Sequence, residues 1–143
     1  MCCLCCAADA QIAKDDENDK ADQAYDKMSS GDKGYFNSYA RFGIHHEMLS
    51  DKIRTEGYQK FLENNPSLLK GKVVLDIGCG TGILSMFAAR AGAKRVIGID
   101  MSEIIFDAQK IVEENGLSDV ITLIRGLCDL LRVEQPDAFA IPS

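Results

Sequence analysis

Residues 72–82 read KVVLDIGCGTG, an apolar, β-branched run that ends in three alternating glycines. A helical pattern follows, and then a second apolar run, residues 96–99, that ends in Asp100. A strand, a glycine turn, a helix and a second strand ending in an acid form the βαβ unit that grips a ribose in nucleoside-binding folds. The sequence therefore predicts a parallel α/β sheet with a nucleoside-cofactor site at the ends of its strands.

The spacing of the glycines narrows the choice of nucleoside. The dinucleotide pattern GxGxxG would need a glycine at position 83, which is Ile83, and the pattern here is GxGxG. Glycines let the backbone turn sharply and approach a ligand closely, whereas a pyrophosphate would also call for amides at the following helix N-terminus. S-adenosylmethionine has no phosphate to hold, and we expect it as the cofactor. A dinucleotide, or a glycine turn that only packs helix on strand, are the alternatives.

This cofactor would use the turn and both acids. Its amino-acid end can lie against the turn, with Asp76 near the ammonium group and Asp100 accepting both ribose hydroxyls. The glycines expected to contact it are Gly78, Gly80 and Gly82.

Length and charge indicate a single domain and argue against direct binding to nucleic acid. The 143 residues fit one domain, and 46% hydrophobic residues suffice for a core. The net charge of −6 is concentrated in residues 9–34, which hold eight acids against four lysines. Because there is no basic stripe, we expect no direct binding to nucleic acid.

Four of the six cysteines lie between Cys2 and Cys6, and the others are Cys79 and Cys128. This is not a disulfide framework, so it indicates a reducing, intracellular setting. The two CxxC spacings of the cluster interleave and cannot each turn around one zinc ion, so no metal site is expected. Reversible acylation of the cluster is the one route to a membrane, and an inert terminus is the default. The apolar start is too short to span a bilayer and has no basic leader.

Composition and periodicity divide the chain into three parts. Residues 1–33 are expected to be a disordered leader, residues 34–126 a cofactor-binding domain and residues 127–143 a divergent tail. The expected elements are a helix from His45 to Asn64, strands at 72–76, 95–99 and 120–124, and helices at 82–91 and from an N-cap at Ser102 to about Asn115.

Three segments before the glycine turn carry a family resemblance. Residues 35–39 read YFNSY, residues 43–49 read GIHHEML and residues 51–55 read DKIRT. With the turn, they resemble the protein arginine methyltransferases, within the class I S-adenosylmethionine-dependent fold, over residues 34–126. The resemblance implies an α/β fold, an incomplete Rossmann-like class I methyltransferase domain made of an N-terminal helical cover and the first three parallel strands.

The resemblance also implies roles for individual residues. Arg54 would bind the cofactor carboxylate through two parallel hydrogen bonds. An aromatic lid over the cofactor would be formed by Tyr35, Phe36 and Tyr39. His45 and Met48 would line the active site, and Asp129 would lie near the adenine amino group. Without the family context, a surface arginine, ordinary helix packing of aromatics and a capping or exposed histidine explain these residues as well.

The family transfers the sulfonium methyl group to a guanidine nitrogen of arginine. A guanidinium has a pKa above about 12, so its lone pair is delocalised, and two glutamates on a loop opened by Ser-Glu-Trp-Met-Gly-Tyr orient it. The residues after Gly126 do not contain that loop, nor the substrate-binding barrel and the dimerisation arm that the family carries on it. Neither Glu134 nor Asp137 replaces the loop by motif. We therefore expect little or no methyl transfer from this polypeptide alone.

The missing segment also bears on the sheet. In a doubly wound sheet the fourth strand pairs with the free edge of the first, so that edge is expected to be unpaired. Its exposed residues would be Val73, Val74, Leu75 and Ile77. Residues 137–141 are a possible remnant of the fourth strand, and Pro142 disfavours its extension.

Three functional readings remain open. The first is a partial product of a genuine arginine methyltransferase. The second is a non-catalytic cofactor-binding or regulatory fragment that pairs with a full-length relative. The third is a methyltransferase of another substrate class, completed by a partner subunit. By resemblance, the substrates would be glycine- and arginine-rich proteins and histone tails, and the location cytoplasm and nucleus. The product stays open between monomethyl, asymmetric dimethyl and symmetric dimethyl arginine, and the motifs present favour the asymmetric type.

Overall fold

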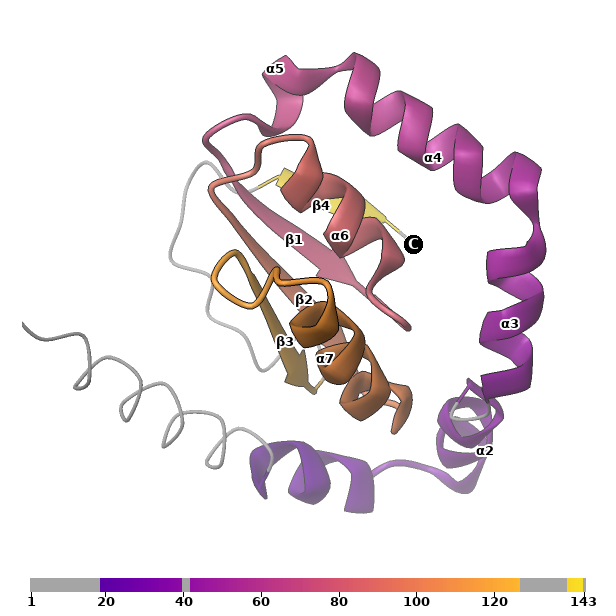
Figure 1. The fold of residues 1–143 in the computed structure, drawn as a ribbon. Helices are drawn as coiled ribbons and strands as arrows, with labels where there is room; N and C mark the ends of the chain where they lie inside the picture. Colours follow the sequence, from indigo (N-terminus) through magenta and orange to yellow (C-terminus); the bar gives the residue numbers. More distant parts are fainter. Residues whose placement is uncertain (1–18, 40–41, 127–138, 143) are drawn as a thin grey trace, which may run out of the picture.

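The computed structural model describes residues 19–39, 42–126 and 139–142 (Figure 1). A four-stranded parallel sheet lies at its centre, with the strand order β3-β2-β1-β4. The strands are β1 (Val73–Ile77), β2 (Arg95–Asp100), β3 (Ile121–Arg125) and β4 (Phe139–Pro142). The predicted parallel α/β fold and its first three strands are confirmed, and each strand lies within one residue of its expected position.

Two helices connect the first three strands and cover one face of the sheet. Helix α6 (Ile83–Arg90) packs on β1 and β2, and α7 (Ile104–Glu114) packs on β2 and β3 (Figure 1). Along β1, alternate side chains are buried, and Val74 and Asp76 point to the covered face. This is the βαβ arrangement that the apolar runs predicted, because parallel strands need a crossover helix between them.

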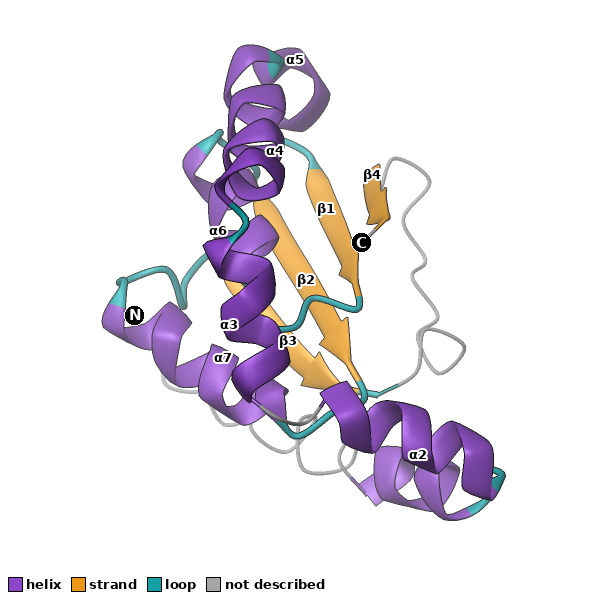
Figure 2. Cartoon of the chain, turned by 90° about the vertical axis from the view of Figure 1, so that its right-hand side faces the viewer, coloured by secondary structure: helices purple, strands orange, loops and turns teal. Residues whose placement is uncertain are grey.

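A helical cover lies outside α6 (Figure 2). It consists of α2 (Ser30–Tyr39), α3 (Phe42–Ser50), α4 (Lys52–Asn64) and α5 (Pro66–Leu69). The prediction of one helix from His45 to Asn64 is wrong, since Asp51 separates α3 from α4. Its side chain accepts a hydrogen bond from the Arg54 backbone N–H at 3.1 Å, which caps the N-terminus of α4.

Regular structure also begins earlier than expected. Residues 19–26 are helical and α2 starts at Ser30, so the prediction of a disordered segment up to residue 33 is wrong for residues 19–33. The cause is long-range, because Ala21 is fully buried and Asp22 forms an ion pair with Arg125, about a hundred residues away. Composition alone carries no signal of such contacts. The division of the chain into three domains stays a prediction, and residues 1–18, 127–138 and 143 lie outside the described residues.

The N-terminus of α7 differs from the prediction as well. Glu103 occupies the cap position, and its side chain forms no capping hydrogen bond. The expected cap, Ser102, instead donates its hydroxyl to the Asp100 carboxylate at 2.5 Å. The hydroxyl bonds to Asp100, two residues earlier in the chain, because a hydrogen bond to a charged carboxylate is stronger than one to a backbone group.

The edge of β1 is paired, contrary to the prediction that Val73, Val74, Leu75 and Ile77 would line an open strand. β4 runs parallel to β1, with Val74 opposite Phe139 and Ile77 opposite Pro142. The suspected remnant of a fourth strand therefore exists. Pro142 is its last residue, where the missing N–H costs least in the ladder.

Among the described residues, no helix is long and apolar enough to cross a membrane. The core lies between the covered face of the sheet and the helices α4 to α7. It includes Leu62, Leu69, Val74, Phe87, Val96, Ile105, Val112, Ile121 and Leu123.

Gly98 lies at a tightly packed point of this core. A Cβ atom at this position would lie 2.5 Å from Leu123 Cδ2 and 3.1 Å from both Cys79 Sγ and Ser85 Oγ. Because close-packed interiors resist an added methyl group, we expect Gly98→Ala to destabilise the chain by about 1–3 kcal/mol, measured by urea unfolding.

Gly57 provides the matched control. It lies inside α4, and a methyl group there would meet no atom within 4 Å. Gly57→Ala should stabilise the chain by about 0.5–1 kcal/mol, because alanine loses less backbone entropy in a helix. Equal effects of the two substitutions would contradict the packing at Gly98.

Candidate functional site

The three glycines after β1 form a tight loop at the carboxyl end of the strand. All three have positive φ, with Gly78 at 72°, Gly80 at 53° and Gly82 at 78°. The backbone N–H groups of Gly78 and Cys79 both donate to the Ile99 carbonyl, at 2.8 and 3.0 Å. Residues with a side chain rarely adopt this conformation, so the alternation of glycines is what allows the loop to turn over the end of β2.

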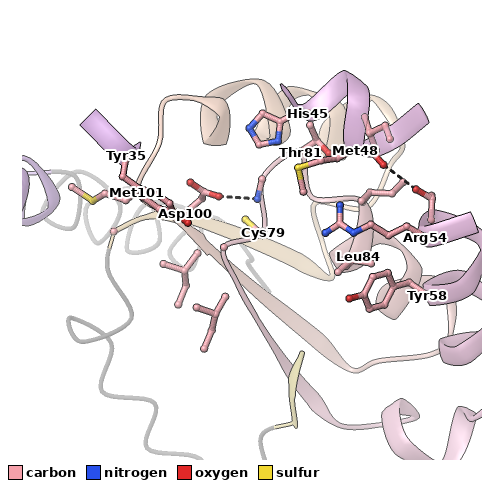
Figure 3. Close-up of a pocket in the computed structure, with 18 residues that line it drawn as sticks. Tyr35, His45, Met48, Arg54, Tyr58, Cys79, Thr81, Leu84, Asp100 and Met101 are labelled. Atoms are coloured by element: carbon pink, nitrogen blue, oxygen red, sulfur yellow. Dashed lines mark hydrogen bonds between the residues drawn. The ribbon is translucent and has the colours of Figure 1, made fainter. Parts of the chain in front are cut away.

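A cavity of about 520 Å³ opens above this loop (Figure 3). It lies at the carboxyl ends of β1 and β2 and is closed by side chains from α2, α3 and α4. Figure 3 shows Tyr35 and Asp100 on one side and Arg54 and Tyr58 on the other. Of the predicted site residues, the cavity brings together Tyr35, His45, Met48, Arg54, Gly78, Gly80 and Asp100.

Asp100 joins the two strand ends that form the floor of the cavity. Its Oδ2 accepts a hydrogen bond from the Gly80 N–H at 2.8 Å, and its Oδ1 accepts from the Ser102 N–H at 2.8 Å and from the Ser102 hydroxyl at 2.5 Å. An ionised carboxylate has about four lone-pair sites. Three donors thus fix its orientation and leave capacity for a ligand hydroxyl.

His45 and Arg54 enter from the helical cover. His45, on α3, is 6% exposed, and its ring atoms lie 3.1–3.2 Å from the place where a Cβ of residue 80 would stand. Arg54, on α4, is half-buried, and its guanidinium carbon lies 5.9 Å from the Tyr58 ring centre. Among the described residues, no carboxylate forms an ion pair with Arg54.

Asp76 is not brought into the lining of the cavity. It is fully buried on the α6 side of β1, where its Oδ2 accepts from the Ser85 hydroxyl at 2.6 Å. In the part of the chain that the structure describes, its Oδ1 has no hydrogen-bond partner. Burial raises the pKa of this carboxyl, the Ser85 hydrogen bonds oppose the rise, and the nearby Asp100 charge adds to it. Asp76 is therefore buried between β1 and α6 and does not face the cavity.

Gly82 is also outside the lining. It is the N-cap of α6, and its Cα faces the side chains of Leu123, Val112 and Ala108. Three further predicted residues cannot be placed, because the side chains of Phe36 and Tyr39 and the whole of Asp129 lie outside the described residues.

The cavity also contains residues that the sequence analysis missed. They are Leu49, Thr55, Tyr58, Ile77, Cys79, Thr81, Ile83, Leu84, Ile99, Met101 and Gly126. Some of them had a signal. Cys79 and Thr81 alternate with the loop glycines, and Tyr58 follows Arg54 by one helical turn, which places both on one face. Burial raises the pKa of the Cys79 thiol well above its ordinary value of 9.0, so this thiol is held in its neutral form.

Comparison with known proteins agrees with this geometry. The family model described as ribosomal protein L11 methyltransferase (PrmA) matches residues 55–137. Protein arginine N-methyltransferase 1 of Saccharomyces cerevisiae is 55% identical over 117 residues, covering 82% of this chain and 34% of the relative. The enzyme of the same name from Schizosaccharomyces pombe is 63% identical over 92 residues, covering 64% of this chain and 27% of the relative. The chain is homologous to the protein arginine N-methyltransferases.

Solved structures of arginine methyltransferases show the same fold. The Trypanosoma brucei PRMT1 enzyme–prozyme complex with AdoHcy matches with a TM-score of 0.66 and 52% identity, covering 68% of this chain and 31% of the other. The PRMT6–SAH structure matches with a TM-score of 0.60 and 43% identity, covering 62% and 26%. The chain thus spans about a third of the length of these relatives. The predicted resemblance to arginine methyltransferases is confirmed, and these two similar structures are complexes with AdoHcy and SAH, the demethylated form of S-adenosylmethionine.

The buried acid of this chain makes stability depend on pH. The folded-state pKa of Asp76 lies above its ordinary value of 3.8, so the folded chain binds more protons than the unfolded chain just above that pH. The free energy of unfolding therefore falls as pH rises from 3.8 through the raised pKa. Compared with wild type, Asp76→Asn should lose this dependence, which urea unfolding between about pH 4 and about pH 8 would measure.

Ser85→Ala is the control for that experiment. Its hydroxyl donates to Asp76 and holds the pKa of the carboxyl down, so its removal should steepen the loss of stability with pH. Parallel pH profiles of wild type and Asp76→Asn would show that Asp76 does not titrate in this range.

Proposed function

We propose that this chain binds S-adenosylmethionine in the cavity and forms the cofactor half of a protein arginine N-methyltransferase. The observation that carries the proposal is the meeting, around one cavity of about 520 Å³, of the glycine loop, the Asp100 carboxylate and the Arg54 guanidinium. The glycine loop allows a ligand to approach the backbone closely, the Asp100 carboxylate suits a ribose, and the Arg54 guanidinium suits a carboxylate. All three fit one ligand. The structure itself brings the three groups together around one cavity.

The Asp100 carboxylate fits the ribose end of the cofactor. Asp100 is fixed by three hydrogen bonds and keeps a lone pair toward the cavity, so it can accept from a ribose hydroxyl. Gly80 has no side chain, and a Cβ there would press on His45. The glycine therefore leaves room for the His45 ring, which packs on the loop beside the place proposed for the ribose.

The amino-acid end of the cofactor fits the opposite wall. Arg54 stacks beside Tyr58 and faces no carboxylate among the described residues. A half-buried guanidinium with unused donors is suited to a planar carboxylate, which takes two parallel hydrogen bonds from it. We infer that the cofactor carboxylate is this partner.

The bound cofactor would supply an electrophilic sulfonium methyl group for transfer to a guanidine nitrogen. For the arginine that would accept the methyl group, the described residues provide fewer binding groups than for the cofactor. Asp100 is the one carboxylate that lines the cavity in the described part of the chain, and its oxygens already hold the loop. A guanidinium needs carboxylates that localise its charge and aim one nitrogen. We propose that residues outside the described ranges, or another chain, complete the acceptor site.

The wider functional proposals follow from the family. The substrates would be arginines of proteins, with glycine- and arginine-rich segments and histone tails as the first to test. The product would be asymmetric dimethylarginine, and the location cytoplasm and nucleus. These proposals concern the whole protein, of which the chain spans about a third by comparison with its relatives.

A second candidate function is a cofactor-binding or regulatory subunit that pairs with a full-length relative. The similar trypanosome PRMT1 structure is an enzyme–prozyme heterotetramer, so pairing of unlike chains occurs in a protein 52% identical to this one. Co-purification with a full-length relative, with a gain in that relative's activity, would favour this candidate. Co-purification without any change in activity would leave it without a regulatory role.

Arg54→Lys tests the cofactor proposal directly. The substitution keeps the positive charge but removes the bidentate geometry, so S-adenosylhomocysteine should bind about tenfold more weakly in isothermal titration calorimetry. Methylthioadenosine, which has the same nucleoside but no amino-acid end, should bind wild type and variant alike. An equal loss for both ligands would place Arg54 away from the carboxylate, and no binding by wild type would contradict the proposed function itself.

The acceptor side is tested by turnover. We expect the purified chain to bind S-adenosylhomocysteine but to transfer no methyl group to an arginine-rich peptide, because the described cavity has no second carboxylate. Radiolabelled S-adenosylmethionine and scintillation counting measure the transfer. Multiple turnover by the chain alone would show that its own residues complete the site.

A further inference from the structure

The helix of residues 19–26 and α2 behave as one unit, which we call the N-terminal hairpin (residues 19–39). The Tyr25 hydroxyl donates to Asn37 Oδ1 at 3.0 Å. Lys33 Nζ donates to the Asp26 carbonyl at 3.1 Å and lies 5.4 Å from the centre of the Tyr25 ring. Because these contacts join the end of the first helix, at Tyr25 and Asp26, to α2, a movement of the first helix would carry the second with it.

The hairpin is attached to the end of the sheet by Arg125, the last residue of β3. One guanidinium nitrogen, Nη1, lies 2.5 Å from Asp22 Oδ1 on the hairpin, and the other, Nη2, lies 2.9 Å from Glu103 Oε1 at the start of α7. The Arg125 side chain is 12% exposed and also lies 5.9 Å from the Phe106 ring. One shielded cation therefore joins the hairpin to the domain.

Packing supports the same attachment. Ala21, next to Asp22, has no exposed surface, although its helix consists mostly of polar and charged residues. Figure 1 shows the hairpin, in indigo and purple, at the end of the sheet where β3 finishes. The ion pair thus holds a docked helix.

Arg125 is also next to the cofactor cavity. In the sheet it lies opposite Asp100, and the following residue, Gly126, donates its N–H to the Asp100 carbonyl at 3.0 Å. At the other end of the hairpin, Tyr35 of α2 lines the cavity while 59% of its surface is exposed. The attachment point, next to Asp100, and the covering side chain of Tyr35 therefore lie toward the same side of the cavity (Figure 3).

We propose that Arg125 is a positioning residue that clasps the N-terminal hairpin through Asp22 and so holds Tyr35 over the bound cofactor. This inference rests on the proposed cofactor function of the cavity and adds a control on how long the cofactor stays bound. Release requires the hairpin to swing away, and the Arg125–Asp22 pair opposes that movement. Arg125 acts through the hairpin and touches no ligand itself.

Solvent exposure limits how much the Arg125–Asp22 ion pair can stabilise the docked hairpin. Asp22 is 60% exposed, so its pair with Arg125 belongs among partly solvated ion pairs, which contribute up to about 1 kcal/mol. A binding-competent state that loses population weakens the apparent affinity by the same factor. The loss of the pair should therefore weaken cofactor binding about two- to fivefold, mainly through faster dissociation.

The experiment compares Asp22→Asn with Glu103→Gln in the full chain. Asp22→Asn cuts the link to the hairpin, whereas Glu103→Gln removes the partner of Arg125 that belongs to the domain and leaves the link intact. Hydrogen exchange of residues 19–39 without ligand, and the dissociation rate of S-adenosylhomocysteine, are measured for both variants. Asp22→Asn should raise exchange in α2 and speed dissociation about two- to fivefold. Glu103→Gln should do neither, and Asp22→Glu should restore wild-type values.

A double-mutant cycle completes the test. In an Arg125→Ala background, Asp22→Asn should have no further effect on exchange or dissociation, because the pair is already lost. Additive effects, or equal behaviour of Asp22→Asn and Glu103→Gln, would overturn the clasp. Absence of S-adenosylhomocysteine binding by wild type would instead refute the proposed function, and hydrogen exchange without ligand would still decide whether Arg125 fastens the hairpin.

Discussion

The hydrogen bond from the Gly80 N–H to the Asp100 carboxylate ties the glycine loop to the end of β2. The loop can reach that carboxylate because its glycines take positive φ and because residue 80 presents no Cβ to His45. The same carboxylate is held from the other side by Ser102. The floor of the cavity, the packing of α3 above it and the orientation of the Asp100 carboxylate thus depend on this contact of 2.8 Å.

The two strand-terminal acids show how environment divides residues of one type. Asp100 accepts hydrogen bonds from three donors and faces the cavity. Asp76 has one serine donor and no water-facing surface, and burial raises its pKa. Both end an apolar run in the sequence. Only the side of the strand on which each side chain lies separates a ligand-facing acid from a buried one.

Prediction from sequence succeeded where the signal is local and weakened where contacts are distant. β1, the glycine loop, α6 and β2 follow from residues close together in the chain. The structure places Gly78, Gly80 and Asp100 of these segments around one cavity. The helix break at Asp51 depends on one side-chain cap. The hairpin depends on Asp22 finding Arg125. The pairing of β4 with β1 joins residues more than sixty positions apart, and no periodicity within either segment encodes it.

That last pairing has a consequence for the nascent chain. β1, β2 and β3 are consecutive, but the strand that covers the outer edge of β1 is made last, about 60 residues after Ile77. At a synthesis rate of about 5–20 residues per second, the edge stays open for roughly 3 to 12 seconds. During that interval a flat apolar strand presents unpaired N–H and C=O groups to any neighbouring chain. Chaperone capture or faulty strand addition on the ribosome would therefore begin at Val74 to Ile77.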